Sequence, residues 1–192
     1  MTDDDVPGVA GDVPPIHTDR LTLVSMSVPF MEALGRGDVA AATREIGAIV
    51  PPWLPAQLEH FVQYRLATLR ITPSAQPWLG RALVLDEAGG ARRVIGTAGF
   101  HAPPDVDGKV EIGYRIDPAY RRKGYAIEAV RGLFDWAAAQ GVHRFVASIS
   151  PTNEASLALA ASLGFRQVGQ QIDEIDGLEL VFETTWPPER RA

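Results

Sequence analysis

The chain contains no cysteine among its 192 residues, and this absence removes several kinds of chemistry. Without a thiol there is no disulfide, no thiolate-bound metal and no cysteine nucleophile. The sequence also lacks a long hydrophobic run, and it begins with acidic residues instead of a basic and then apolar segment. Neither a membrane span nor a signal peptide is therefore expected. Together these absences favour a reducing compartment, and we expect a cytoplasmic protein.

Other absences narrow the choice of ligand. The sequence has neither the G-x-G-x-x-G pattern nor the G-x-x-x-x-G-K-S/T pattern, so it predicts no dinucleotide or P-loop site. The net charge of −6 disfavours nucleic acid, because counterion release requires an extended basic surface, whereas it fits a cationic substrate. No metal is predicted, since the histidines show no ligand spacing. We interpret them as structural or surface residues: His17, His60, His101 and His143.

A chain of this length with 46% hydrophobic residues can form one well-buried domain. Residues 1–15 are rich in aspartate, proline and glycine, so we predict a mobile tail there. Residues 16–188 are predicted to form a single domain of the α/β, or α+β, class.

Hydrophobic periodicity predicts strands and helices in a mixed order. The predicted strands are 21–26, 79–85, 94–100, 110–116, 145–149, 165–175 and 178–185. One or two short helices are predicted within 29–46, broken near Gly35 and Gly37. The other predicted helices are 57–71, 124–140 and 153–164, and Pro51–Pro55 is a rigid connector. Because a crossover helix joins strands 110–116 and 145–149, these two should be parallel. We expect a mixed, mostly antiparallel sheet with one parallel pair and helices on both faces.

A basic run, residues 121–126, lies between an alternating strand and the start of an amphipathic helix. This arrangement places free backbone N–H groups beside three cations and the permissive Gly124. Such a site suits a phosphate-bearing ligand. The alternative is a solvated basic turn with no ligand.

The basic run resembles the acetyl-coenzyme A loop of the GNAT N-acetyltransferase superfamily, whose pattern is Gln/Arg-x-x-Gly-x-Gly/Ala. Arg121, Gly124 and Ala126 occupy its three specified positions. Other segments resemble, in the expected order, the ribosomal-protein-alanine/serine acetyltransferase branch. They are Thr18–Leu23, Glu111–Tyr114, and Asn153-x-x-Ser156 followed by Leu163–Phe165. The similarity extends from about Thr18 to about Trp186.

The resemblance implies the GNAT fold, in which the parallel strand pair splays apart and admits the pantetheine arm of acetyl-coenzyme A. It implies that backbone groups of Tyr114 and Ile116 bind this arm and the thioester; the alternative is an ordinary central strand. The remaining cofactor-binding residues that it implies are Arg121, Arg122, Lys123, Gly124, Tyr125, Ala126, Ile127, Asn153 and Ser156.

The catalytic residues are implied less directly. Many members of the superfamily protonate the leaving thiolate with a tyrosine, but that position is Ala160 here, and the branch uses Ser156 to hydrogen-bond the thiolate. Asn153 and Ser156 also fit ordinary helix capping. Glu111 is the candidate base, relaying a proton through water. Its alternative role is a solvent-facing strand residue or a salt-bridge partner. Asp173 and Glu174 are the other candidates, and these two could instead hold a cationic substrate or be surface charge.

We therefore predict an N-acetyltransferase that passes acetyl directly to a primary amine in a ternary complex. The resemblance to this branch implies a protein N-terminal α-amine as the acceptor. Such an amine needs little help from a base, because about one in 7 is neutral at pH 7, against about one in 2,500 lysine side chains. The alternatives are acetylation of a small amine, such as an antibiotic or polyamine, or an acyl-coenzyme A-binding module without turnover. No nucleic acid or membrane partner is expected, and the chain is predicted to be a monomer or homodimer.

Overall fold

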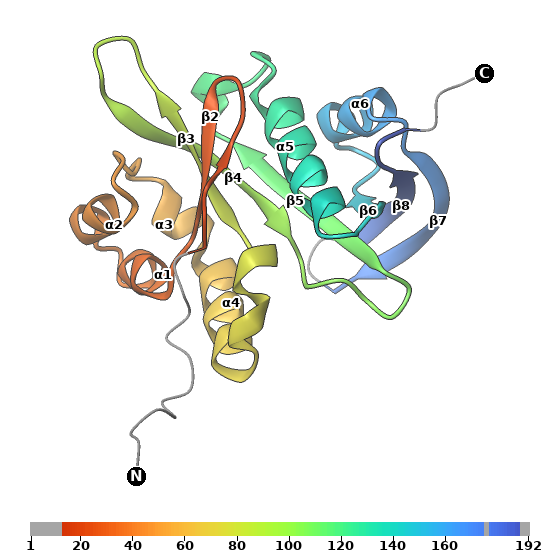
Figure 1. The fold of residues 1–192 in the computed structure, drawn as a ribbon, viewed down its shortest axis with the longest axis horizontal. Coiled ribbons are helices and arrows are strands. Elements are labelled where there is room, and N and C mark those ends of the chain that lie inside the picture. The colour runs from red at the N-terminus through yellow and green to blue at the C-terminus, as the bar shows by residue number, and fades with distance from the viewer. Residues whose placement is uncertain (1–12, 175–176, 189–192) are drawn as a thin grey trace.

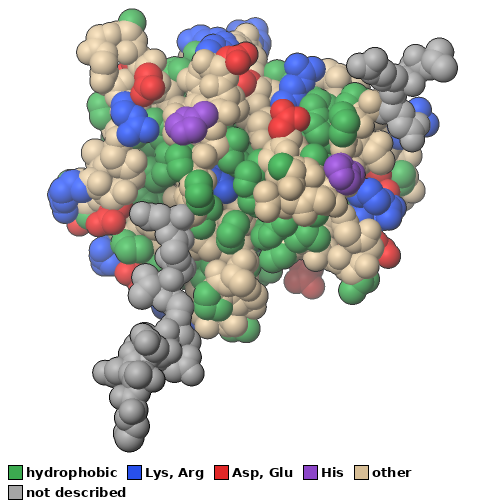
Figure 2. All heavy atoms as spheres, viewed as in Figure 1, with side chains coloured by type: hydrophobic (Ala, Val, Ile, Leu, Met, Phe, Trp, Pro, Cys, Tyr) green, Lys and Arg blue, Asp and Glu red, His purple; other side chains and the backbone are tan. Residues whose placement is uncertain are grey.

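A computed structural model of the chain describes residues 13–174 and 177–188. Residues 1–12 of the predicted tail, and Asp176 of the predicted last turn, lie outside these ranges. Within them, no helix combines the length and the apolar character that crossing a membrane requires. On the surface drawn in Figure 2, acidic and basic side chains are interspersed, and the basic ones form no continuous stripe.

Among the described residues, eight strands form one sheet in the order β1-β2-β3-β4-β5-β6-β8-β7 (Figure 1). All neighbours are antiparallel except β5 and β6, which confirms the predicted mixed sheet with one parallel pair. The short β1 strand was not predicted. The strands are β1 (Ile16–His17), β2 (Leu21–Ser25), β3 (Arg81–Asp86), β4 (Arg92–Phe100), β5 (Lys109–Ile116), β6 (Arg144–Ile149), β7 (Arg166–Asp173) and β8 (Gly177–Thr185).

The helices follow the predicted periodicity with one difference. Residues 29–46 contain two helices, as the predicted break allows, and the left-handed Gly37 (φ 69°) and the capping Asp38 separate them. The predicted connector contains the start of α3, since proline is accepted in a first helical turn. The helices are α1 (Val28–Gly35), α2 (Val39–Ile46), α3 (Leu54–Gln57), α4 (Glu59–Ile71), α5 (Tyr125–Ala139) and α6 (Glu154–Ser162), with 3₁₀ turns at Pro73–Trp78 and Pro118–Tyr120.

Alternating side chains of the sheet form a separate hydrophobic core on each face. In β3, Leu83 joins the core that contains α5 and the end of α6. Its neighbours Ala82 and Val84 join the core that contains α1, α2 and α4. Figure 1 shows α5 lying across the central strands, with α6 beside it. The predicted helices on both faces are thus confirmed.

The parallel pair separates partway along its length. β5 pairs with β6 only over Lys109–Glu111, opposite Arg144–Val146, although β5 continues to Ile116. On its other edge β5 stays paired with β4 as far as Ile116. The two strands therefore part beyond Glu111, as the predicted splay requires, and we call the space between them the gap.

Candidate functional site

The edge of β5 that faces the gap carries free backbone groups. The Glu111 carbonyl accepts a hydrogen bond from the His101 backbone on the β4 side (2.8 Å). Because successive residues of a strand direct their backbone groups to opposite edges, Tyr114 and Ile116 direct theirs toward the gap. The Ile116 carbonyl already accepts from Arg121 Nε (3.0 Å), whereas the Tyr114 backbone is left for an added strand-like ligand.

The loop before α5 presents a row of unused donors. Arg122 has a φ of 58°, which is uncommon for a residue with a Cβ, and Gly124 has a φ of 83° at the N-cap of α5. Within the part of the chain that the structure describes, no backbone N–H from Arg122 to Ile127 donates to a protein acceptor. Tyr125, Ala126 and Ile127 are the first turn of α5. Free N–H groups at the positive end of a helix form a fitting cradle for a pyrophosphate.

Arg20, which sequence reasoning did not single out as a site residue, holds this loop from the side. Its guanidinium donates to the Lys123 carbonyl (3.0 Å), pairs with Glu128 (2.6 Å) and lies 4.4 Å from the centre of the Tyr125 ring. A Cβ on Gly124 would stand 3.2 Å from Arg20 Nη2. Arg20 lies inside Thr18–Leu23, the segment that resembles the family's opening strand. This position was the sequence feature that could have marked Arg20 as a site residue. We call this contact of Arg20 with Glu128 and the Lys123 carbonyl the loop clasp.

Glu128 is the acidic member of the loop clasp. The Thr18 hydroxyl and the Arg20 backbone N–H both donate to its Oε1 at 2.7 Å. Burial raises the pKa of Glu128, but these hydrogen bonds and the Arg20 charge outweigh it and leave the pKa below its ordinary value. Glu128 is therefore a carboxylate at neutral pH, and the clasp is charged.

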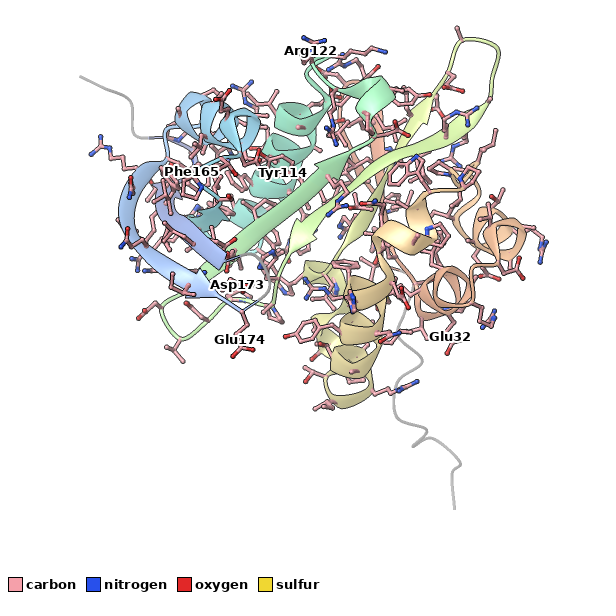
Figure 3. The ribbon with its side chains drawn as sticks, turned by 180° about the vertical axis from the view of Figure 1, so that it is seen from behind. Glu32, Tyr114, Arg122, Phe165, Asp173 and Glu174 are labelled. Atoms are coloured by element: carbon pink, nitrogen blue, oxygen red, sulfur yellow. The ribbon has the colours of Figure 1, made fainter. Side chains whose placement is uncertain are left out.

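The three cations of the basic run are used differently. Arg121 bonds the Ile116 carbonyl, and Lys123 Nζ donates to the Ala119 carbonyl (3.1 Å). For Arg122, by contrast, the described residues provide no side-chain hydrogen bond. Figure 3 shows Arg122 at the outer end of the loop, beyond the end of β5. Arg122 is thus the cation best placed to move toward a ligand phosphate.

Two hydroxyl groups meet on the α5–α6 face of the gap. Asn153 caps α6 by accepting from the Ser156 backbone N–H (3.2 Å), so the predicted cap is present. Tyr114 lies midway along β5, near Phe165 (Figure 3). Burial raises the pKa of the Tyr114 hydroxyl, and the adjacent Ser156 hydroxyl partly counteracts this rise. The two hydroxyl groups do not reach full hydrogen-bond geometry. The described residues offer the Tyr114 hydroxyl no other hydrogen-bond partner.

The opposite face of β5 carries Glu111 and an unanticipated neighbour. Glu111 Oε2 lies 3.6 Å from Nδ1 of His101, which follows β4 and lies opposite Glu111. The nearby His101 ring, and then Ser148, hold the pKa of Glu111 below its ordinary value, although burial acts in the other direction. The second ring nitrogen of His101 lies over Gly113, where a Cβ would come within 2.7 Å of it. From the sequence, we interpret His101 as a structural or surface residue. Its place beside Glu111 depends on the pairing register of β4 with β5, which the sequence pattern does not reveal.

Asp173 lies toward the outer edge of the same face. Figure 3 shows Asp173 and Glu174 at the end of β7, on the other side of Tyr114 from Arg122. Gln171, two residues earlier and so on the same face of β7, donates to Ser148 (3.3 Å), the neighbour of Glu111. Asp173 therefore stays a prediction, at the periphery of the site.

A cavity of about 180 Å³ opens on this face of β4 and β5. His101, Gly113 and Tyr114 line it from the sheet, so the imidazole beside Glu111 and the edge of the gap share one space. Its other walls come from Gln57, Leu58, Phe61, Arg65, Gly80, Thr97–Phe100 and Arg115. No group of three metal-ligating side chains occurs among the described residues.

The sheet with a gap in its parallel pair, together with the free N–H groups at the start of α5, defines an acyl-coenzyme A-dependent transferase. Residues 29–166 match the family model described as acetyltransferase (GNAT) domain, and the chain belongs to this family. It is an N-acetyltransferase. The uncharacterised N-acetyltransferase YjdG of Bacillus subtilis is 27% identical over 152 residues, 78% of this chain and 88% of that protein.

Solved structures show the same fold. The microcin C7 self-immunity acetyltransferase MccE, in complex with acetyl-CoA and AMP, superimposes with a TM-score of 0.62 at 19% identity, covering 91% of this chain and 98% of that one. A putative ribosomal-protein-serine acetyltransferase from Vibrio cholerae gives a TM-score of 0.61 at 19% identity, covering 89% and 97%.

Proposed function

We propose that this enzyme transfers the acetyl group of acetyl-coenzyme A directly to an α-amine. The observation that carries the proposal is the free backbone edge of β5. That edge has a phosphate cradle at one end, the Ser156 and Tyr114 hydroxyls on one face, and the Glu111–His101 pair on the other. Acetyl-coenzyme A supplies an acetyl group activated as a thioester, and the chain supplies its positioning and the proton transfers.

The cofactor fits the residues present. The N–H groups from Arg122 to Ile127 hold the pyrophosphate, and Arg122 adds charge. The backbone of Tyr114 and the N–H of Ile116 bind the pantetheine arm as an added strand, and a backbone N–H at Tyr114 stabilises negative charge on the carbonyl oxygen. Exposed Asn153 bonds the amide arm with the donors that its capping role leaves free.

On the acceptor side, the Glu111–His101 pair receives the proton of the attacking amine. Glu111 is ionised near neutrality, because its pKa is lowered, and it holds the His101 ring through Nδ1. The second ring nitrogen then lies over Gly113, at the edge of the gap. An α-amine needs little help to lose its proton, so this exposed pair is sufficient.

On the cofactor side, Ser156 hydrogen-bonds the departing sulfur. Ala160 is 2% exposed and packs in the core, so it offers no acid. Tyr114 contributes a phenol instead, and its hydroxyl is free to donate to Ser156 once the serine proton turns to the thiolate. A thiol pKa of about 8.5 means that the leaving group needs stabilisation more than full protonation.

Two kinds of acceptor fit the proposal. Fold neighbours named as ribosomal-protein acetyltransferases support a protein N-terminus, the acceptor that the sequence predicts. The cavity beside His101 supports a small α-amine, because about 180 Å³ is less than the roughly 300–1,000 Å³ of drug-sized sites. Either acceptor enters from the face opposite Ser156, as direct attack in a ternary complex requires.

The test is thiol release from acetyl-coenzyme A in the presence of amino acids, their amides and short N-terminal peptides, with the acetylated amine identified by mass spectrometry. We expect intersecting initial-rate lines, since the chain has no cysteine to carry the acetyl group. We also expect an unchanged protein mass after mixing with acetyl-coenzyme A alone. Coenzyme A binding without acetylation of any α-amine would favour the non-catalytic binding module instead.

A further inference from the structure

The cavity beside His101 contains positive charge that no carboxylate neutralises. Arg65 and Arg115 both line it. Neither of them forms an ion pair with an acidic side chain of the described residues. Glu111 is committed to His101 and Ser148. The cavity is therefore cationic inside a protein whose net charge is −6.

Arg65 is buried, at 4% exposure, which is unusual for an unpaired guanidinium. It donates to the carbonyls of Phe100 (3.3 Å) and His101, and its charge lies 4.9 Å from the Phe61 ring centre. These contacts offset only part of the cost of burial, so the pKa of Arg65 is lowered. Within the described structure its Nε–H has no acceptor.

Arg115 brings a second, exposed cation to the same cavity. It lies on the same face of β5 as Glu111 and Gly113, because side chains of a strand alternate. Four residues along a strand correspond to about 13 Å between Glu111 and Arg115. Arg115 donates to Gln57 of α3, a neutral partner that keeps its full charge available. The cavity thus has Arg65 beside the His101 backbone and Arg115 farther along β5.

We propose that the amine acceptor carries an oxyanion near its amine, a carboxylate or phosphate, which Arg65 and Arg115 bind while the amine faces His101. This inference rests on the proposed acetyl transfer and specifies its substrate class. An oxyanion in the cavity neutralises charge that the protein leaves uncompensated. Polyamines and other polycationic amines are disfavoured, contrary to the expectation from the acidic composition.

Two sources supply the same chemistry, and matched acceptors distinguish them. In the first arm, serine, glycine and glutamate are each compared with their C-terminal amides in the thiol-release assay, at pH values that give equal fractions of neutral amine. In the second arm, N-terminal peptides with glutamate as the second residue are compared with glutamine peptides. We expect the anionic member of at least one arm to have a kcat/KM about 10- to 150-fold higher.

Variants connect this preference to the cavity. Arg115→Gln should reduce the preference for the anionic member toward one, and Arg115→Glu should reverse it. Arg166→Gln, an exposed arginine on β7 outside the cavity, is the matched control and should keep it. Because Arg65 also hydrogen-bonds backbone carbonyls, the Arg65→Lys protein is tested only after circular dichroism shows that it folds. This variant should weaken the preference for the anionic acceptor, because lysine lacks the planar guanidinium group.

A binding measurement separates the inference from the activity. N-acetylserine and N-acetylserinamide are titrated calorimetrically into the protein saturated with coenzyme A. Tighter binding of N-acetylserine than of N-acetylserinamide, with the difference lost in Arg115→Gln, supports the oxyanion subsite. This holds even if no acceptor is acetylated, and in that case only the proposed function fails. Equal binding of both ligands or binding of neither, or an anionic preference that survives in Arg115→Glu, overturns the subsite.

Discussion

The two faces of β5 offer different kinds of groups to the ligands that we propose. On the α5–α6 side, the proposed cofactor site consists mainly of backbone groups: the N–H row at the start of α5 and the unpaired edge at Tyr114. On the opposite side, the proposed acceptor site consists of side chains from separate elements, namely Arg65 of α4, His101 after β4 and Arg115 of β5. Any sequence that adopts the fold contains these backbone groups, whereas each of these side chains depends on which residue the sequence has at that position. The cofactor half is thus a property of the fold, and the acceptor half is a property of this chain.

The largest expected effect comes from blocking the backbone cradle. Gly124→Glu adds a side chain at a φ of 83° and a negative charge where the pyrophosphate binds, so calorimetry should detect no coenzyme A binding. Gly141→Glu is the matched control, because Gly141 has a φ of 87° at the other end of α5 and open space around it. Unchanged affinity in a folded Gly124→Glu protein would remove the cradle from the site.

The next effect concerns the proton acceptor on the opposite face. Glu111→Gln should lower kcat by about 10²- to 10⁴-fold while sparing coenzyme A affinity, because the proton of the amine then lacks an ionised acceptor. Exposed Glu45→Gln on α2 controls for the change of charge. Asp173→Asn should change only the KM of the acceptor. A larger fall in kcat for Asp173→Asn than for Glu111→Gln would assign the base to Asp173.

A smaller effect is expected where one side chain contributes to the cofactor face. Ser156→Ala should slow acetyl transfer about 10- to 150-fold, the value of one hydrogen bond to a developing charge. Affinity for acetyl-coenzyme A should change much less, since that charge appears only during reaction. Ser162→Ala, at the other end of α6, should leave both unchanged. Weak binding with normal turnover at saturation would make Ser156 a ground-state contact.

The smallest effect tests the loop clasp. The pKa of Glu128 is lowered by folding, so its contribution to stability is present above the unfolded pKa of about 4.3 and is lost as the pH falls through the folded value. Glu128→Gln should lower the free energy of unfolding at pH 7 by about 1 kcal/mol and flatten its decline between pH 5 and 3, by roughly that amount. Urea denaturation across this pH range measures both, and parallel wild-type and mutant curves would contradict a charged clasp.

The predictability of the two halves differs for a physical reason. The phosphate loop, α5 and the cap of α6 are local, so residues 121–140 and Asn153 contain most of the information that builds them. The splayed pair was inferred from family resemblance, because periodicity in 110–116 does not reveal where pairing with β6 stops.

The acceptor half was not predictable in the same way. His101 meets Glu111 only through the register of β4 with β5, and Arg65 reaches the His101 carbonyl from a helix 36 positions away. A lone histidine and a helical arginine have no local pattern that marks them as site residues. The acidic composition favoured a cationic substrate, but composition averages over the surface, whereas the cavity is lined by arginine.

The loop clasp has a consequence for the order of events during protein synthesis. Arg20 and Glu128 are separated by 108 positions, so a ribosome adding about 5–20 residues per second leaves Arg20 without its partner for about 5–20 s. During the first part of this interval, until Arg81–Asp86 are made, β2 also has no β3 to pair with. The loop clasp therefore closes only when Glu128, in the middle of the polypeptide, returns to Arg20 near its beginning, and a nascent chain halted before α5 lacks the clasp around the loop that we propose to hold the cofactor.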